Sequence, residues 1–334
     1  MKNYMVKFLV LLIALLIAIS TMAFMASQEK QIKQHTQTKE SLKFYPHTYD
    51  QCPELPSPCT MEDGTEIVMA FTKDNKCMII PVTVEKGEPL NYRNKQWYGK
   101  GRQLEVDASD FPTLARTGLH SEIELDQIKT ITGRSIAEIT EIGRPERYSG
   151  AGFMSHDEDI ISVLRGDNRL VTQLGSIHPQ MAKPLFHVFN IILTVKKDSK
   201  RGNIGGVLYN KRKVYLKFQG AKGWQESIFN DEILGYWQIE MWRDLDKEEK
   251  TFLSREYSNL TDEHMAQLIK KLSHIHTGEM APYYIMRYGF YEGHTSYRAD
   301  PVVISFIFGL RSIQEIEAAF EGNLNKVLTE HFTK

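Results

Sequence analysis

The chain has 334 residues, of which 42% are hydrophobic and 25% charged, values typical of a globular protein with one large or two small domains. Its formal net charge is −1 at pH 7. Removing Lys2 and Lys7 from the 41 basic residues leaves 39 against 42 acidic residues for the part after position 26. No basic excess is available to neutralise phosphates, so we expect no nucleic-acid partner.

The first 26 residues carry the clearest signal in the sequence. Lys2 and Lys7 precede an uncharged apolar run over residues 8–26, which ends in small residues with candidate cleavage sites after Ser20, Ala23 or Ala26. This order is typical of a signal peptide. An uncleaved membrane anchor is the alternative, because the run approaches the ~20 residues that span a bilayer, and a buried core helix is a third interpretation. We therefore expect a protein that is exported to the periplasm or the extracellular space, or anchored to the membrane by its N-terminus.

Residues 27–60 are polar at first and then rich in proline, and we expect them to form a stalk or linker. A soluble domain over residues 61–334 follows, with a boundary between two subdomains near residue 200 as an option. Cys52 and Cys59 flank a short proline-rich loop. Either these two form a disulfide in an oxidising compartment, with Cys77 left over, or all three cysteines remain thiols.

The predicted elements come in blocks along the chain. Residues 66–72 and 77–84 are β-prone and joined by hairpin spacing, and residues 104–108 add a candidate strand. Ser-x-x-Glu capping boxes predict helix starts at Ser121, Ser135, Ser155 and Ser312. A helical apolar face follows over residues 177–192, interrupted by Pro184, where we expect a kink.

Strands return over residues 203–242, where apolar and polar side chains alternate with a period of two. Trp224, Trp237 and Trp242 lie in this region, and we expect them in the core and rim of a sheet, with sugar stacking as the alternative. A helix over 261–273, an apolar segment over 302–310 and an amphipathic helical segment from Ser312 complete the chain. The blocks predict an α+β fold, in which antiparallel sheet packs with segregated amphipathic helices after an N-terminal hydrophobic segment.

The first candidate site is the polar, glycine-rich segment 143–159. Arg144 and Arg147 are candidate substrate-binding residues that would grip an anion together with the backbone amides of residues 149–152. His156 is a candidate catalytic base, with Asp157 or Asp159 to orient it. The alternative is structural, because Ser155 and Glu158 match a capping box and acids suit a helix N-terminus.

The second candidate is the sequence His274-Ile-His276-Thr-Gly-Glu279, whose spacing resembles a metal-binding pattern. The same residues follow a predicted helix, so capping of its C-terminus is the alternative. We expect no metal site here, and the sequence leaves the cofactor undefined.

The third candidate is segment 283–301, where tyrosine, arginine, acid and histidine side chains are concentrated. A pocket with aromatic walls and a few convergent polar groups needs this mixture. We expect Gly293 to permit an unusual backbone in the loop and Asp300 to cap a helix that begins at Pro301. The candidate catalytic residues are Glu292 and His294, and the candidate substrate-binding residues are Tyr291, Tyr297 and Arg298. A structural network of buried tyrosines, arginines and acids is the alternative.

These features favour an exported or membrane-anchored enzyme, a hydrolase or transferase that acts on a polar envelope or extracellular substrate such as a small molecule or a glycan. The alternative is a non-catalytic binding or structural module on a membrane stalk. The enzyme hypothesis predicts that segments 144–159 and 283–300 converge, with Glu292, His294 and an arginine within reach of one another.

Overall fold

The computed structural model describes residues 48–61, 64–82, 109–197, 204–231 and 233–332. The hydrophobic segment 1–26, most of the expected stalk and the candidate strand 104–108 lie outside the described residues. Within the described ranges, no helix combines the length and the apolarity that crossing a membrane requires.

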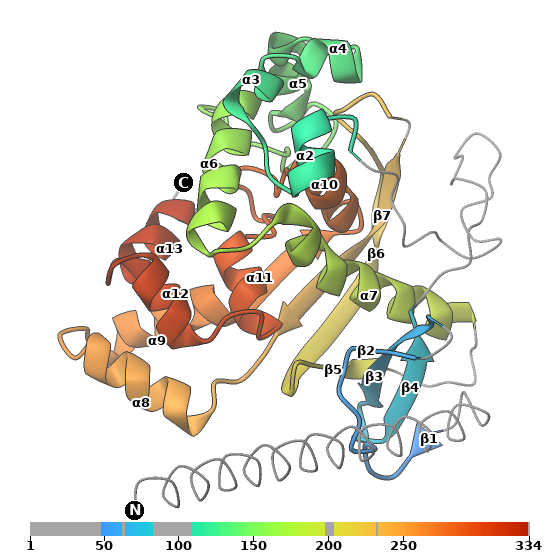
Figure 1. The fold of residues 1–334 in the computed structure, drawn as a ribbon, viewed down its shortest axis with the longest axis vertical. Coiled ribbons are helices and arrows are strands. Elements are labelled where there is room, and N and C mark those ends of the chain that lie inside the picture. The colour runs from blue at the N-terminus through green and yellow to red at the C-terminus, as the bar shows by residue number, and fades with distance from the viewer. Residues whose placement is uncertain (1–47, 62–63, 83–108, 198–203, 232, 333–334) are drawn as a thin grey trace, which may run out of the picture.

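The fold is α+β, as the sequence predicts, and it is built on one antiparallel sheet (Figure 1). The strand order is β1-β4-β3-β5-β6-β7-β8, and β2 pairs with β3 outside this path. The strands are β1 Thr48–Tyr49, β2 Cys59–Thr60, β3 Glu66–Thr72, β4 Cys77–Pro81, β5 Ile204–Tyr209, β6 Arg212–Glu226, β7 Leu234–Trp242 and β8 His274–Gly278. The sheet thus includes two short strands from the segment that the sequence suggests as a stalk.

Helices surround one side and one end of this sheet (Figure 1). They are α2 Pro112–Thr117, α3 Glu122–Leu125, α4 Ile128–Thr132, α5 Ile136–Gly143, α6 Ile160–Gln173, α7 His178–Lys197, α8 Lys247–Glu256, α9 Asp262–Ser273, α10 Ala281–Tyr288, α11 Pro301–Ile307, α12 Ile313–Ala319 and α13 Leu324–Phe332. The main core lies between the sheet and helices that include α7, α9 and α11. Residues on both sides of position 200 share this core.

A second apolar cluster supports the end of the molecule where α2–α5 gather (Figure 1). It joins residues of α5 and α6 to aromatic side chains of the α10 region, including Tyr284 and Phe290. Phe153, which precedes α6, is fully buried in the same cluster. This packing holds the segment before α6 against the segment after α10, two stretches more than 100 residues apart in the sequence.

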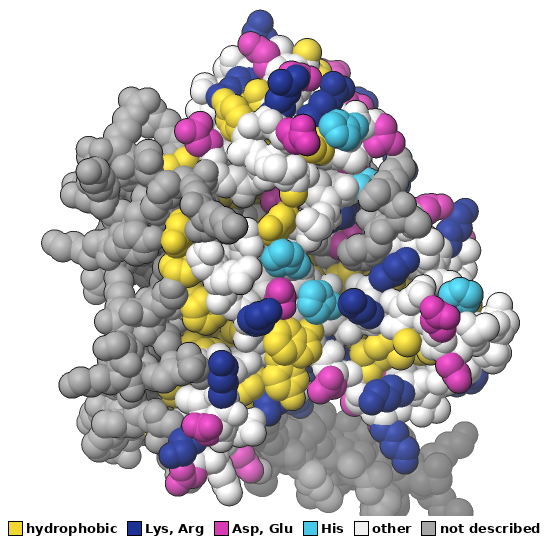
Figure 2. Space-filling model, turned by 180° about the vertical axis from the view of Figure 1, so that it is seen from behind, with side chains coloured by type: hydrophobic (Ala, Val, Ile, Leu, Met, Phe, Trp, Pro, Cys, Tyr) yellow, Lys and Arg dark blue, Asp and Glu magenta, His cyan; other side chains and the backbone are white. Residues whose placement is uncertain are grey.

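The face of β6, β7 and β8 that points away from the core carries polar and aromatic side chains. Alternation predicts this, because Val214, Leu216, Ile239 and Met241 are buried on the core side. Figure 2 views the molecule from behind and shows hydrophobic, histidine and oppositely charged side chains gathered on this side. Trp237 belongs to the core and Trp242 is half-buried on the outer face, so the two tryptophans take different roles.

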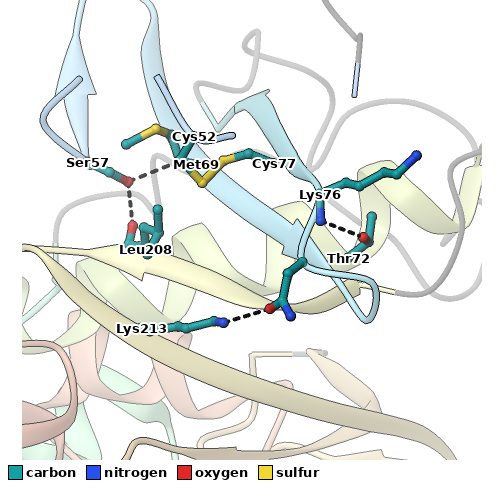
Figure 3. The surroundings of a disulfide bond; sticks show 9 residues. Cys52, Ser57, Met69, Thr72, Lys76, Cys77, Leu208 and Lys213 are labelled. Carbon is teal, nitrogen blue, oxygen red and sulfur yellow. Dashed lines mark hydrogen bonds between the residues drawn. A yellow bond between two sulfur atoms is a disulfide. The ribbon is translucent and has the colours of Figure 1, made fainter. Parts of the chain in front are cut away.

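The disulfide joins Cys52 to Cys77, with Cα atoms 4.9 Å apart (Figure 3). Cys59 is a free thiol. The two pairing states expected from the sequence are therefore both wrong. The register explains the result: Tyr49 pairs with Cys77, which brings the chain after β1 beside β4, whereas Cys59 pairs with Ile67 on β3. The disulfide fastens the short edge strand β1 to the sheet.

Three of the four predicted capping boxes begin helices. Ser121, Ser135 and Ser312 each precede a helix whose N3 glutamate bonds back to the cap. The prediction at Ser155 is wrong, because α6 begins at Ile160 and is capped by Asp159. Glu158 does accept a hydrogen bond from the Ser155 amide, but no helix begins there, and its carboxylate also contacts His294.

Candidate functional site

The candidate site is built on the connection between α10 and α11, residues 291–300, which we call the 291–300 loop. It begins after Gly289, which ends α10 at a φ of 62°, and it ends at Asp300, which caps α11 through the Val302 amide as predicted. The amide of Ala299 donates to the Tyr291 carbonyl at 3.0 Å, so the two ends of the loop lie side by side. The residues between them are held in a compact turn.

Buried ion pairs fix this loop from within. The Arg298 guanidinium donates to Asp167 of α6 at 2.7 Å and to Asp300 at 3.1 Å, and it also donates to the Glu292 carbonyl. The three charged side chains are at most 5% exposed. Burial raises the pKa of Asp167 to about 6, although the Arg298 charge opposes that shift. Asp167 also accepts the Tyr291 amide, so α6 positions the start of the loop.

The central feature of the site is a pair between Glu158 and His294. The Nδ1 atom of His294 hydrogen-bonds one carboxylate oxygen of Glu158, and the His294 amide donates to the other oxygen at 2.9 Å. Burial alone would raise the pKa of Glu158, but the bonds from His294 and the Ser155 amide lower this pKa to about 2. An ionised Glu158 accepts the Nδ1 hydrogen of His294, which fixes the orientation of the imidazole ring. The His294 side chain is 24% exposed, so solvent reaches it.

Gly293 permits the close contact between the 291–300 loop and the segment before α6. A Cβ atom at this position would lie 2.3 Å from the Glu158 carboxylate and 3.0 Å from the Met154 Cα. The Gly293 amide also donates to the Phe153 carbonyl at 2.7 Å. The unusual backbone that we expect at Gly293 occurs instead at Glu292, which is left-handed with a φ of 63°. Glycine is therefore needed for space, and the strain falls on the neighbouring glutamate.

Glu292 is a buried carboxyl group in a conformation that favours glycine. The residue is 2% exposed, and Thr295 donates its hydroxyl to the carboxyl at 3.3 Å. Burial raises the pKa of Glu292 to about 8, against a smaller opposing effect from Thr295 and Arg298. The group is protonated at neutral pH, so it is able to donate a proton. Strained backbone and shifted pKa values are concentrated at functional sites, which makes Glu292 a strong candidate.

The remaining candidates from this loop have defined partners. The Tyr291 hydroxyl bonds Nδ1 of His178 at 3.0 Å in the buried interior, and Nε2 of His178 bonds Asn168 at 3.1 Å. The Tyr291 side chain therefore anchors the start of the loop to the protein interior. The half-buried ring of Tyr297 lies with its centre 4.5 Å from the ring centre of His276 on β8, at the surface.

The structure places the candidates from segment 143–159 differently. Arg144 and Arg147 both pair with Glu141 of α5, which satisfies their charge at the surface. His156 is exposed, Asp159 caps α6, and Asp157 accepts a hydrogen bond from Ser155. The histidine that hydrogen-bonds an acid of this segment is His294, which comes from the other end of the chain.

The histidines of the second candidate lie where a helix passes into a strand. His274 directly follows α9 as its C-cap residue, and His274 and His276 both lie on β8, paired with Trp242 and Glu240 of β7. Glu279 accepts the amides of Tyr236 and Trp237. Over the described ranges, no group of three or more histidine, cysteine, aspartate or glutamate residues is arranged to hold a metal ion.

Two residues of the site were not among the candidates from the sequence. Glu158 fits a capping box, and its true partner is 136 residues away. Asp167 carried a usable signal, because it lies on the apolar stripe of α6 with Ile160, Leu164 and Val171. An acid on an apolar stripe must be paired when it is buried, and this one pairs with Arg298.

The site therefore combines a histidine oriented by an ionised carboxylate with a protonated carboxyl two residues before it in the sequence. No known protein family, curated protein or solved structure matches this chain.

Proposed function

We propose that this protein is an exported or membrane-anchored hydrolase or transferase, with His294 as the general base and Glu292 as the general acid. The observation that carries the proposal is the opposite shift of two carboxyl groups beside one loop. Glu158 has a pKa of about 2 and Glu292 a pKa of about 8. Paired titratable groups whose pKa values are pushed apart are a mark of acid–base catalysis.

The chemistry follows from the protonation states. Nε2 of His294 accepts a proton from water, or from an acceptor hydroxyl in a transferase, and the resulting oxygen nucleophile forms a bond to the electrophilic centre of the substrate. The ionised Glu158 stabilises the imidazolium that results, as the carboxylate does in triads of this kind. The bond to the leaving oxygen breaks, and Glu292 gives that oxygen its proton. The His294 proton then returns to Glu292 through solvent or product, which restores the starting state.

Arg298 and Asp167 act as positioning residues in this scheme. Arg298 holds the Glu292 carbonyl and Asp167 holds the Tyr291 amide, so the pair fixes the strained turn that carries the acid. A buried ion pair does not by itself stabilise a fold, because desolvation offsets the attraction. In this proposal the Arg298–Asp167 pair fixes the position of the turn that carries Glu292.

Two features support export. The charge-free segment at the start of the sequence suits a signal peptide or an anchor, and the Cys52–Cys77 disulfide suits an oxidising compartment. A second candidate function is a binding module, and the specific observation that favours it is the half-buried aromatic surface on the outer face of β6, β7 and β8.

The experiment is a hydrolysis assay of the full-length protein on chromogenic esters, glycosides and phosphoesters. We expect His294→Gln and Glu292→Gln to lower kcat/KM by about 10²–10⁴-fold, the range typical of one general acid or base. Glu146→Gln is the matched control, because Glu146 is also a left-handed glutamate but is exposed. Absence of turnover by the wild type, or unchanged rates in folded variants at both positions, would contradict the proposal.

Glu158→Gln separates a positioning carboxylate from a structural one. Glutamine keeps one hydrogen-bond acceptor but removes the charge that stabilises the imidazolium. We expect kcat to fall more than KM rises, and the dependence of kcat on pH to change. An unchanged pH profile would assign Glu158 a purely structural role.

A further inference from the structure

A set of side chains that the proposed chemistry does not use lies on the outer face of β6, β7 and β8. The strand register arranges them in rows that cross all three strands. The ring row consists of Tyr215, Trp242 and His274. The charged row consists of Lys217, Glu240 and His276, and the amide row consists of Gln219, Gln238 and Gly278.

The ring row forms a platform of nearly parallel rings. The ring planes of Tyr215 and Trp242 differ by 16°, with centres 5.7 Å apart, and those of Trp242 and His274 differ by 23°, with centres 6.5 Å apart. All three side chains are half-buried, so each supports its neighbour and leaves part of its surface to solvent. Rings held in this way on a rigid sheet lose little entropy when a ligand stacks on them.

The other two rows supply hydrogen-bonding groups, and their side chains carry no net charge. Lys217 pairs with Glu240 at 3.5 Å, so the charged row carries both signs. Burial lowers the pKa values of His274 and His276, so both imidazoles are neutral at pH 7. The amide row adds donors and acceptors of both kinds. Such a surface suits a neutral ligand with many hydroxyl groups and a flat apolar side.

The charged row contacts the 291–300 loop. His276 of the charged row lies against Tyr297, and Tyr297 belongs to the same loop as Glu292 and His294. The charged row therefore touches the loop that carries the proposed acid and base.

We propose that the rows bind a neutral polysaccharide chain, whose pyranose rings present C–H faces to the ring row and hydroxyl groups to the other rows. This inference rests on the proposed function for its substrate role, because it makes a glycan the substrate class of the His294 site. Binding to the rows stands by itself and is measurable without turnover.

The test is calorimetric titration of the full-length protein with cellohexaose, maltohexaose and N-acetylchitohexaose. We expect at least one hexasaccharide to bind, Trp242→Ala to weaken that binding about tenfold or more, and Trp242→Phe to restore part of it. Phe252→Ala is the control, because Phe252 is a half-buried aromatic residue on α8. Because the ligand is neutral, 0.5 M NaCl should leave the affinity within about twofold.

Three results would overturn the inference: binding of none of the hexasaccharides, equal binding by the folded Trp242→Ala variant, or stronger binding of an unstructured peptide at the same rows. Hexasaccharide binding without turnover refutes the catalytic proposal alone. Turnover of other substrates without hexasaccharide binding refutes the glycan inference alone.

Discussion

Replacing Glu292 with glutamine should change how the stability of this protein depends on pH. The carboxyl has a pKa of about 8 in the folded chain and 4.5 as its ordinary value. Glutamine has nearly the shape of the protonated acid and does not titrate. The difference between the unfolding free energies of the two proteins, followed against pH, therefore reports the protonation of Glu292 alone.

The sign follows from proton binding. Below pH 4.5 the carboxyl is protonated in both states, and its contribution to stability is fully present. Between pH 4.5 and 8 the folded state keeps a proton that the unfolded state has lost, so stability falls by about 1.4 kcal/mol per pH unit. From pH 5 to pH 8 the loss is roughly 4 kcal/mol, and it is complete once the pH has passed the folded pKa.

The measurement is urea unfolding of wild type and Glu292→Gln at pH 5, 6, 7 and 8. We expect the free energy of unfolding of the wild type to fall relative to the variant by about 4 kcal/mol across this range. Glu292→Gly should follow the glutamine variant with a constant offset of about 1–2 kcal/mol, because glycine relieves the left-handed backbone. The exposed Glu146→Gln control should run parallel to the wild type. If the free energies of unfolding of the wild type and Glu292→Gln change in parallel with pH, Glu292 does not keep its proton in the folded state and cannot be the acid proposed here.

Other substitutions test the supports of the site. Gly293→Ala should separate the Glu158–His294 pair and lower activity at least tenfold, measured by kcat/KM beside a circular dichroism check, because its Cβ would collide with the Glu158 carboxylate. Arg298→Met should destabilise the fold by about 3–5 kcal/mol in urea unfolding, because it leaves buried acids unpaired, and a loss below about 1 kcal/mol would refute this. Glu158 contributes stability above pH 4.5 that is lost as the pH falls toward 2, so Glu158→Gln should flatten acid unfolding followed by fluorescence. Cys77→Ser should cost about 3 kcal/mol, because it opens a loop with a sequence separation of 25, and a Cys59→Ser variant should match the wild type.

The sequence by itself determined the local elements of this protein. Period-two alternation identified β6 and β7, helical periodicity identified α7 and α9, and three capping boxes marked helix starts. The Asp300 cap and Pro301 also lay where the local pattern predicted. These features depend on residues within a few positions of one another, and for that reason a linear pattern is enough to find them.

Tertiary structure decided the pairings. Glu158 matched a cap from its local spacing, but the chain packs it against His294, and a backbone without a Cβ at Gly293 permits the contact. Cys52 lay nearest in sequence to Cys59, yet strand pairing gave it Cys77. Burial, which shifts the pKa values of Glu292 and Asp167, is a property of the whole packed core. Desolvation and contacts across more than 100 residues are set by the fold, and no local window of the sequence contains them.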